Sequence, residues 1–116
     1  MKRRIGCQAE EMAAEYLAKK GYRIIARNYR TLYGELDIVC EKGNDIVFVE
    51  VRSKSTKAFG CPEESITARK IERIRRSALV YLSQESRNRY RRILFDVVAV
   101  ELNTGQPEIR HIEGAF

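Results

Sequence analysis

The chain has 116 residues, which suffice for one domain with a hydrophobic core and are too few for two, so we expect a single domain over residues 1–116. Its 22 Lys and Arg against 16 Asp and Glu give a net charge of +6, which favours nucleic acid as a partner over the alternative of a merely solvated charged helix face. The sequence contains no signal-peptide core, no apolar run of membrane-spanning length and no zinc or disulfide spacing among its three cysteines, so we expect a cytoplasmic protein without a membrane partner.

The first predicted element is an amphipathic helix over about residues 4–20, which ends at Lys20-Gly21. Its apolar stripe consists of Ile5, Ala9, Met12, Ala13, Tyr16 and Leu17. Glu10 lies at the border of this stripe, where its side chain can lean over a sheet packed against the helix. The alternative is that Glu10 is an ordinary helix-border glutamate.

Three strands, a second helix and two further strands follow in the prediction. The strands are expected over residues 22–29, 35–41, 45–53, 94–102 and 108–112, and the second helix opens at Pro62-Glu63-Glu64 and has a basic outer face. This order predicts an α/β fold with a mixed five-stranded sheet and a helix on each side. The helix between the third and fourth strands allows a parallel crossover there.

The turn between the second and third strands sets which side chains face each other. Lys42-Gly43-Asn44-Asp45 can close as a two-residue turn, because Gly43 and Asn44 both accept a positive φ. In the antiparallel ladder that continues from this turn, the residue numbers of every facing pair add up to 87, as those of Lys42 and Asp45 do. Asp37 is then opposite Glu50, and Glu35 is opposite Arg52. A turn one residue longer or shorter would move Asp37 off that face of the sheet.

Glu50 lies in the apolar run Ile46-Val47-Phe48-Val49-Glu50-Val51, where an unpaired charge is costly to bury. Two carboxylates facing each other also destabilise a hairpin. A divalent cation between them would reverse that repulsion, and Mg²⁺ or Mn²⁺ prefers carboxylate and carbonyl oxygens. The hairpin therefore predicts a metal site at Asp37 and Glu50, with a polar strand-end residue as the alternative for Asp37.

Glu10, Asp37, Glu50 and a basic residue two positions after Glu50 form a set that resembles the core of the PD-(D/E)xK nucleases. This superfamily, with its restriction-endonuclease-like core, includes Holliday junction resolvases and tRNA-splicing endonuclease-like domains. The resemblance implies that Glu10, Asp37, Glu50 and the main-chain carbonyl of Val51 hold Mg²⁺ or Mn²⁺, which activates water and stabilises charge on the phosphate. It also implies a lysine that assists the nucleophile.

A closer resemblance covers nearly the whole chain. The matching residues are Gly6, Glu10, Ala13, Tyr16-Leu17, Gly21-Tyr22, Asn28, Arg30, Gly34-Glu35-Leu36-Asp37, Phe48-Val49-Glu50-Val51, Gly60, Lys70, Phe95-Asp96 and Ala115-Phe116. Together they resemble the small YraN-like family of bacteria. This resemblance implies a nucleic-acid-binding protein and a suspected metal-dependent endonuclease that hydrolyses phosphodiester bonds, and it names no substrate. Our expectation favours DNA over RNA, in repair or recombination, and leaves branched or linear DNA and a monomer or a homodimer open.

One departure from the family pattern concerns catalysis, because Arg52 stands where a lysine is expected. Arginine stays protonated and cannot act as a general base, although it can hold a phosphate. Lys54 on the same strand or Lys70 from the second helix could replace the missing lysine. The alternative function is therefore a catalytically weak or inactive nucleic-acid-binding module built on a nuclease-like core.

Further basic and aromatic residues are candidate nucleic-acid contacts. The basic candidates are Arg30, Lys70, Arg73 and Arg76. Tyr29, Tyr33 and Tyr90 lie among arginines and could stack on bases, although aromatic residues are also common at strand edges. Asp96 and His111 stay outside the expected metal site, as structural or surface residues.

Overall fold

In the computed structural model the described residues are 2–54, 66–84, 90–102 and 105–116, of which residues 2–7 and Lys54 are described by their backbone alone. The elements are α1 (Lys2–Lys19), β1 (Arg23–Thr31), β2 (Gly34–Lys42), β3 (Asp45–Lys54), α2 (Ala68–Gln84), β4 (Arg92–Glu101) and β5 (Glu108–Ile112). This order confirms the predicted sequence of helix, three strands, helix and two strands.

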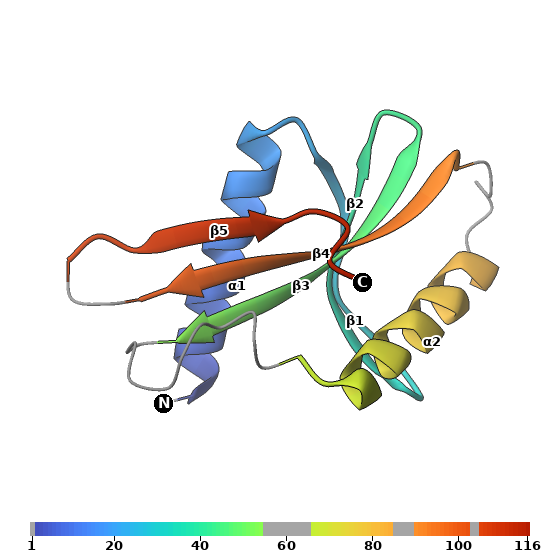
Figure 1. The fold of residues 1–116 in the computed structure, drawn as a ribbon, viewed down its shortest axis with the longest axis horizontal. Coiled ribbons are helices and arrows are strands. Elements are labelled where there is room, and N and C mark those ends of the chain that lie inside the picture. Colours follow the sequence, from blue (N-terminus) through green and yellow to red (C-terminus); the bar gives the residue numbers. More distant parts are fainter. Residues whose placement is uncertain (1, 55–65, 85–89, 103–104) are drawn as a thin grey trace.

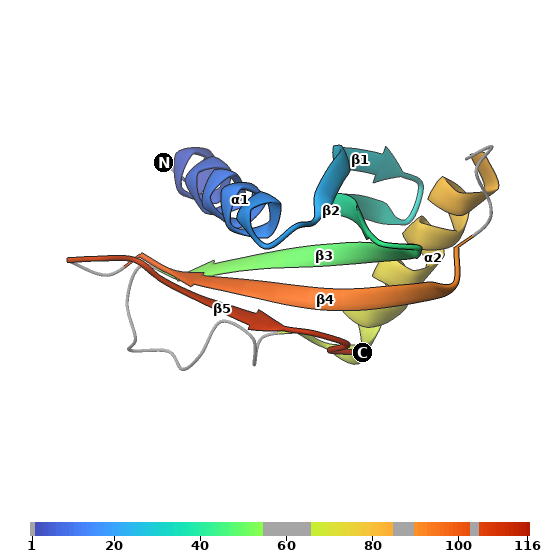
Figure 2. The same cartoon turned by 90° about the horizontal axis from the view of Figure 1, so that it is seen from above.

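The five strands form one mixed sheet in the order β1-β2-β3-β4-β5. β3 and β4 are parallel, and the other neighbours are antiparallel. The parallel pair requires a crossover, which α2 provides (Figure 1). β1 and β2 curve away from the plane of β3 and β4 (Figure 2), and the described pairing of β2 with β3 ends at Ile38 and Val49.

Each helix covers one face of the sheet. Alternate residues of β3 divide between two clusters, because Val47 and Val49 pack with the α1 residues Ala13 and Leu17 while Phe48 packs with Ile74 of α2. The small side chains of Ala9, Ala13 and Ala14 let α1 approach the sheet closely. Glu50 shares the strand face of Phe48, so its side chain lies on the α2 side.

The second helix begins later than predicted. Ile66 and Thr67 are not helical, and α2 starts at Ala68, while the expected opening at Pro62-Glu63-Glu64 lies outside the described residues. Thr67 caps the helix, because its Oγ1 accepts a hydrogen bond from the Lys70 amide at 3.2 Å. The cap fixes the position of the first turn, and Lys70 belongs to that turn.

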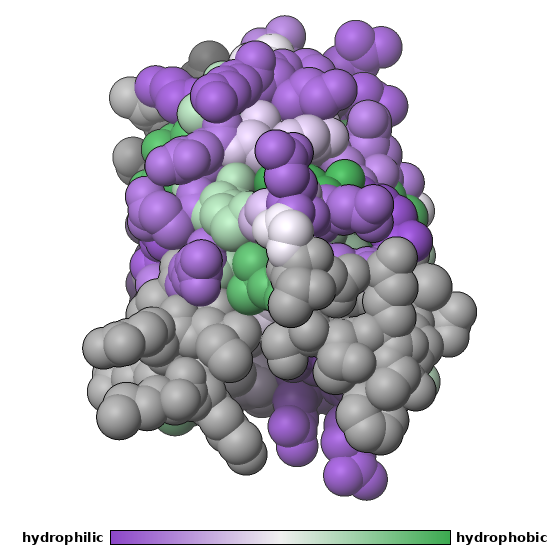
Figure 3. Space-filling view, turned by 90° about the vertical axis from the view of Figure 1, so that its left-hand side faces the viewer, coloured by the Kyte–Doolittle hydropathy of each residue, from purple (hydrophilic) through white to green (hydrophobic). Residues whose placement is uncertain are grey.

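The described surface is mainly hydrophilic at the end of the molecule where β3 and β4 finish, with only a small apolar area there (Figure 3). Within the described part of the chain, neither helix combines the length and the apolarity needed to cross a membrane. Cys40, one of the three cysteines, is buried as a free thiol in the cluster under α1.

Candidate functional site: two carboxyl groups where the sheet opens

The site lies where β2 separates from β3. The predicted two-residue turn is confirmed, since Lys42 pairs with Asp45 and Gly43 has φ 61°, and the register keeps its sum of 87 as far as Ile38 and Val49. Beyond that pair β2 leaves β3, so the backbone ladder does not reach Asp37. The Asp37 carboxylate instead accepts a hydrogen bond from the Val51 amide, at 2.9 Å to Oδ2.

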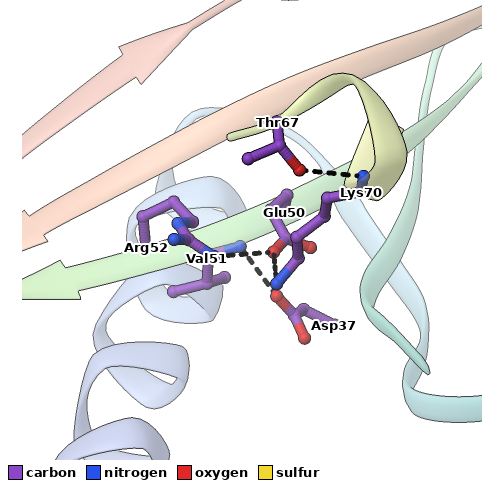
Figure 4. A network of polar contacts seen from close by, with 6 residues as sticks. All are labelled: Asp37, Glu50, Val51, Arg52, Thr67 and Lys70. Carbon is purple, nitrogen blue, oxygen red and sulfur yellow. Dashed lines mark hydrogen bonds and ion pairs between the residues drawn. The ribbon is translucent and has the colours of Figure 1, made fainter. Parts of the chain in front are cut away.

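Glu50 is buried beside the opening of the sheet, and its carboxyl group is paired with two basic side chains. Its side chain is 5% exposed, and its Oε2 lies 3.1 Å from Lys70 Nζ and 3.4 Å from Arg52 Nη1 (Figure 4). The expectation that Arg52 faces Glu35 is wrong, because Glu35 lies past the end of the β2–β3 ladder and pairs with Arg30 of β1 at 3.3 Å. Two cations therefore compensate the buried Glu50 carboxylate.

The Asp37 and Glu50 carboxyl groups repel each other when both are charged. Burial, followed by the negative charge of Glu50, raises the pKa of Asp37 to about 8. The charge of Glu10 and a hydrogen bond between the Asp37 and Glu50 carboxyl groups act in the same direction, while the Val51 amide opposes them. Asp37 is therefore expected to keep its proton near neutral pH.

Glu10 reaches the same electrostatic environment from α1, on the other face of the sheet. Burial, then the charge of Glu35, raises its pKa, and the charge of Glu50 contributes further. Arg27 and a hydrogen bond from Asn28 act in the opposite direction. Asn28 has φ 53°, a conformation that asparagine tolerates better than most residues, and it lies in β1 beside the opening.

The three predicted acidic residues thus influence one another electrostatically. Among the described residues, however, no group of three or more His, Cys, Asp or Glu side chains is arranged to hold a metal ion as it stands. Binding a cation there would require the side chains to move toward a common point. Asp37 and Glu50 are the pair already in hydrogen-bond contact.

A pocket of about 240 Å³ opens above the two carboxyl groups. Its lining residues are Tyr33, Gly34, Glu35, Asp37, Glu50, Lys70, Arg73, Ile74 and Ser77. The pocket therefore has an acidic floor from the sheet and a basic rim from the first turns of α2. A site with both charges can hold a metal ion and an anion side by side.

The other predicted residues divide between this pocket and the surrounding surface. Arg73 lines the pocket, whereas Arg76 lies farther along α2 and Arg30 is a mostly exposed residue that pairs with Glu35. The side chain of Lys54 lies outside the description, although its backbone ends β3. Of the two lysines proposed to replace the missing one, Lys70 contacts Glu50 and lines the pocket.

Two functional positions were missed from the sequence. Thr67 orients the first turn of α2, and a threonine just before an apolar-periodic segment is an N-cap signal that the Pro62-Glu63-Glu64 signal outweighed. Ser77 lines the pocket from the middle of α2, and its Oγ lies 2.7 Å from Thr31 Oγ1 of β1. No pattern within α2 indicates that contact, because it depends on how the helix docks.

Asp96 and His111 form a separate buried pair on the α1 side of the sheet. His111 Nε2 lies 2.7 Å from Asp96 Oδ2, and their side chains are 6% and 2% exposed. The Gly114 amide donates to Asp96 Oδ1 at 3.0 Å. These contacts join β4 to β5 and the C-terminal segment, as the structural expectation for both residues anticipated.

Comparison with known proteins gives the family. A family model described as "Uncharacterised protein family UPF0102" matches residues 9–100. The chain belongs to this family. The UPF0102 protein of Syntrophomonas wolfei is 48% identical over 116 residues, covering all of both chains, and that of Moorella thermoacetica is 46% identical over 117 residues, covering 99% of this chain and 97% of the relative.

A third UPF0102 protein, from Rhodococcus opacus, is 42% identical over 113 residues, or 97% of this chain and 95% of its own. The YraN-like resemblance inferred from the sequence is thereby confirmed. The matched range of the family model contains every acidic residue of the candidate site and both cations that pair with Glu50. The relatives are bacterial, as the resemblance implied.

Proposed function

We propose that this protein is a metal-dependent endonuclease that hydrolyses phosphodiester bonds, with DNA favoured over RNA and branched DNA among its substrates. The observation that supports it is the coupled pair Asp37 and Glu50 beneath a pocket with a basic rim. Two close carboxyl groups repel each other when both are charged, and a bound cation would relieve that repulsion. A bacterial enzyme of this kind would meet its DNA in the cytoplasm, where we place it.

The oxygen donors of the site are of the kind that a divalent cation prefers, and its side chains would have to move toward a common point to bind one. Asp37, Glu50, the main-chain carbonyl of Val51 and, from α1, Glu10 supply the oxygen ligands that Mg²⁺ or Mn²⁺ prefers. Cation binding would displace the proton of Asp37 and remove the repulsion from Glu50 that contributes to its raised pKa. Such an ion supplies an activated water and positive charge for the developing phosphate oxygens.

Lys70 and Arg73 are placed to hold the phosphate. Both line the pocket from the first two turns of α2. The first turn, to which Lys70 belongs, carries no acidic residue, and the helix dipole disfavours cations at this end. Basic side chains at this end cost stability, so an anionic ligand at the helix terminus explains them better than folding does. Lys70, which already lies beside Glu50, is the lysine that we propose in place of the one expected at position 52.

Cleavage assays test this proposal directly. Labelled single-stranded, duplex, flap and four-way-junction DNA and a structured RNA are incubated with Mg²⁺ or Mn²⁺ and the native protein. We expect cutting of DNA that is lost in Asp37→Ala and Glu50→Ala and retained in Glu108→Ala, a control at an exposed carboxylate on β5 far along the sheet. Cutting that survives both site substitutions would refute the assignment.

A second candidate function rests on the pairing of Glu50 with Arg52 and Lys70, which compensates the buried charge without any metal. In this alternative the protein binds nucleic acid but does not cut it, with Arg73 and Arg76 supplying salt-sensitive affinity. Calorimetric titration with Mn²⁺ separates the two. Heat of binding that disappears in Asp37→Asn favours the nuclease, whereas binding of DNA without binding of Mn²⁺ favours the module.

A further inference from the structure

A second hollow adjoins the carboxylate pocket. This groove has a volume of about 500 Å³ and is lined by Tyr33, Arg76, Leu79, Val80 and Ser83. Tyr33 lines both the groove and the carboxylate pocket. One aromatic ring therefore separates the place proposed for the phosphate from an open surface on α2.

The structure holds the Tyr33 end of the β1–β2 hairpin in a fixed position. The Tyr33 amide donates to Thr31 Oγ1 at 3.0 Å, and the Thr31 hydroxyl donates to the Gly34 carbonyl at 3.0 Å. Thr31 Oγ1 also lies 2.7 Å from Ser77 Oγ, which ties the hairpin to α2. Gly34 has φ 145°, a conformation that side chains disfavour, so the turn is specific to this sequence.

The core does not explain the apolar surface beside this hairpin. Leu32 is 99% exposed, Leu79 is 66% exposed and Tyr33 is 42% exposed, which makes them three of the large exposed hydrophobic residues in the described part of the chain. By contrast, Tyr29 donates to Gln84 and packs edge-on against Tyr81, and Tyr90 donates to Glu41, so these two tyrosines are structural. Tyr33 alone of the three remains a candidate for stacking.

Positive charge lies beside the exposed Tyr33 ring. The Arg76 guanidinium lies 5.5 Å from the Tyr33 ring centroid and is oriented by Glu72 at 2.9 Å, and Arg73 lines the adjoining pocket. An aromatic face with cations beside it attracts a nucleobase and its phosphate together, whereas an apolar protein partner would gain nothing from the arginines. Charge complementarity thus selects nucleic acid as the occupant.

We propose that Tyr33 is a stacking platform for one unpaired nucleobase, next to the nucleotide whose phosphate enters the carboxylate pocket. This inference rests on the proposed function and gives its substrate class as single-stranded or locally unpaired nucleic acid. A base within a duplex is already stacked on both faces and cannot cover the ring. Leu79 supplies an apolar wall on the α2 side of the groove, and Arg76 holds the backbone of the unpaired strand.

Fluorescence anisotropy in EDTA tests the platform without cleavage, using a labelled single strand of about 12 nucleotides and the matching duplex. Tyr33→Ala should weaken single-strand binding between about fivefold and a hundredfold and leave duplex binding within about twofold. Tyr33→Phe, which keeps the ring, should bind both as the native protein does. One abasic nucleotide, moved along the strand, should weaken native binding at one position and have no effect there in Tyr33→Ala.

The outcomes distinguish this inference from the proposed function. If Tyr33→Ala binds the single strand as tightly as the native protein, or loses duplex binding equally, the platform is refuted while cleavage at Asp37 and Glu50 stands as proposed. If Arg73→Gln weakens both substrates and flattens the salt dependence, the phosphate contacts are supported independently of Tyr33. If the native protein binds no nucleic acid, both proposals fail.

Discussion

Replacing Asp37 by Asn should stabilise the metal-free protein at alkaline pH. The asparagine oxygen can still accept the Val51 amide hydrogen bond, so the substitution removes the charge and keeps the contact. The pKa of Asp37 is raised from 3.8 to about 8 by burial and by Glu50. The folded state therefore binds more protons than the unfolded state between these values, and stability is lost as pH rises through about 8.

The magnitude follows from that difference in pKa. At about 1.4 kcal/mol per unit, the change from 3.8 to about 8 corresponds to roughly 6 kcal/mol as an upper limit. Side-chain rotation and water in the pocket relieve much of this, so Asp37→Asn should raise the free energy of unfolding by about 1 to 2 kcal/mol at high pH. For a domain of this size that is a Tm increase of about 4–8 °C.

Thermal unfolding followed by circular dichroism in EDTA, at about pH 5 and about pH 9, measures the effect. The native protein and Asp37→Asn should have similar Tm at the lower pH and separate at the higher one. Asp45→Asn is a control that should lower Tm instead of raising it. Hydrogen bonding to Arg92 lowers the pKa of Asp45, so the charged carboxylate of Asp45 stabilises the fold at pH values above its normal pKa. An Asp37→Asn variant that is less stable than the native protein at pH 9, or offset equally at both pH values, would refute the reasoning.

Three further predictions concern α2 and the buried pair. Lys70→Met should lower the cleavage rate about a hundredfold, whereas Arg52→Met, outside the pocket lining, should lower it less than about tenfold; equal losses in single-turnover assays would contradict the role given to Lys70. Thr67→Ala should lower the free energy of unfolding, measured by chemical denaturation, by about 1 kcal/mol, because it removes the N-cap. Asp96→Asn should cost about 2 kcal/mol, because it weakens a buried pair with His111, and an unchanged denaturation midpoint would show that the pair is dispensable.

The hairpin was predictable because short-range rules determine it. Gly43 and Asn44 specify a two-residue turn, and that turn fixes every pair from Lys42–Asp45 to Ile38–Val49. The face on which Glu50 lies then follows from strand alternation. The order of helices and strands was also predictable from the sequence, because the spacing of apolar residues changes between helical and strand patterns along the chain.

The opening of the sheet could not be predicted by counting outward from the turn. Counting extends the ladder past Asp37 and Glu50 to Glu35 and Arg52, whereas the observed ladder ends at Ile38 and Val49, three pairs earlier, where β2 curves away from β3 (Figure 2). Because backbone pairing ends before Asp37, the Val51 amide donates its hydrogen bond to the Asp37 carboxylate. Glu35 moves with β2 and pairs with Arg30, which frees Arg52 to pair with Glu50.

The position of Lys70 shows why the lysine that we propose for catalysis was hard to assign from the sequence. Strand alternation favoured Lys54, which is four residues from Glu50, while Lys70 reaches Glu50 only because α2 docks across the opened sheet. Docking depends on Ile74, Ala78 and Tyr81 packing against β2 and β3, a set of long-range contacts that no local pattern encodes. A lysine supplied by α2 moves with the helix rather than with the strand that carries Glu50. Contacts between nucleic acid and the outer face of α2 would therefore act on the position of Lys70, which couples substrate binding to the geometry of the site.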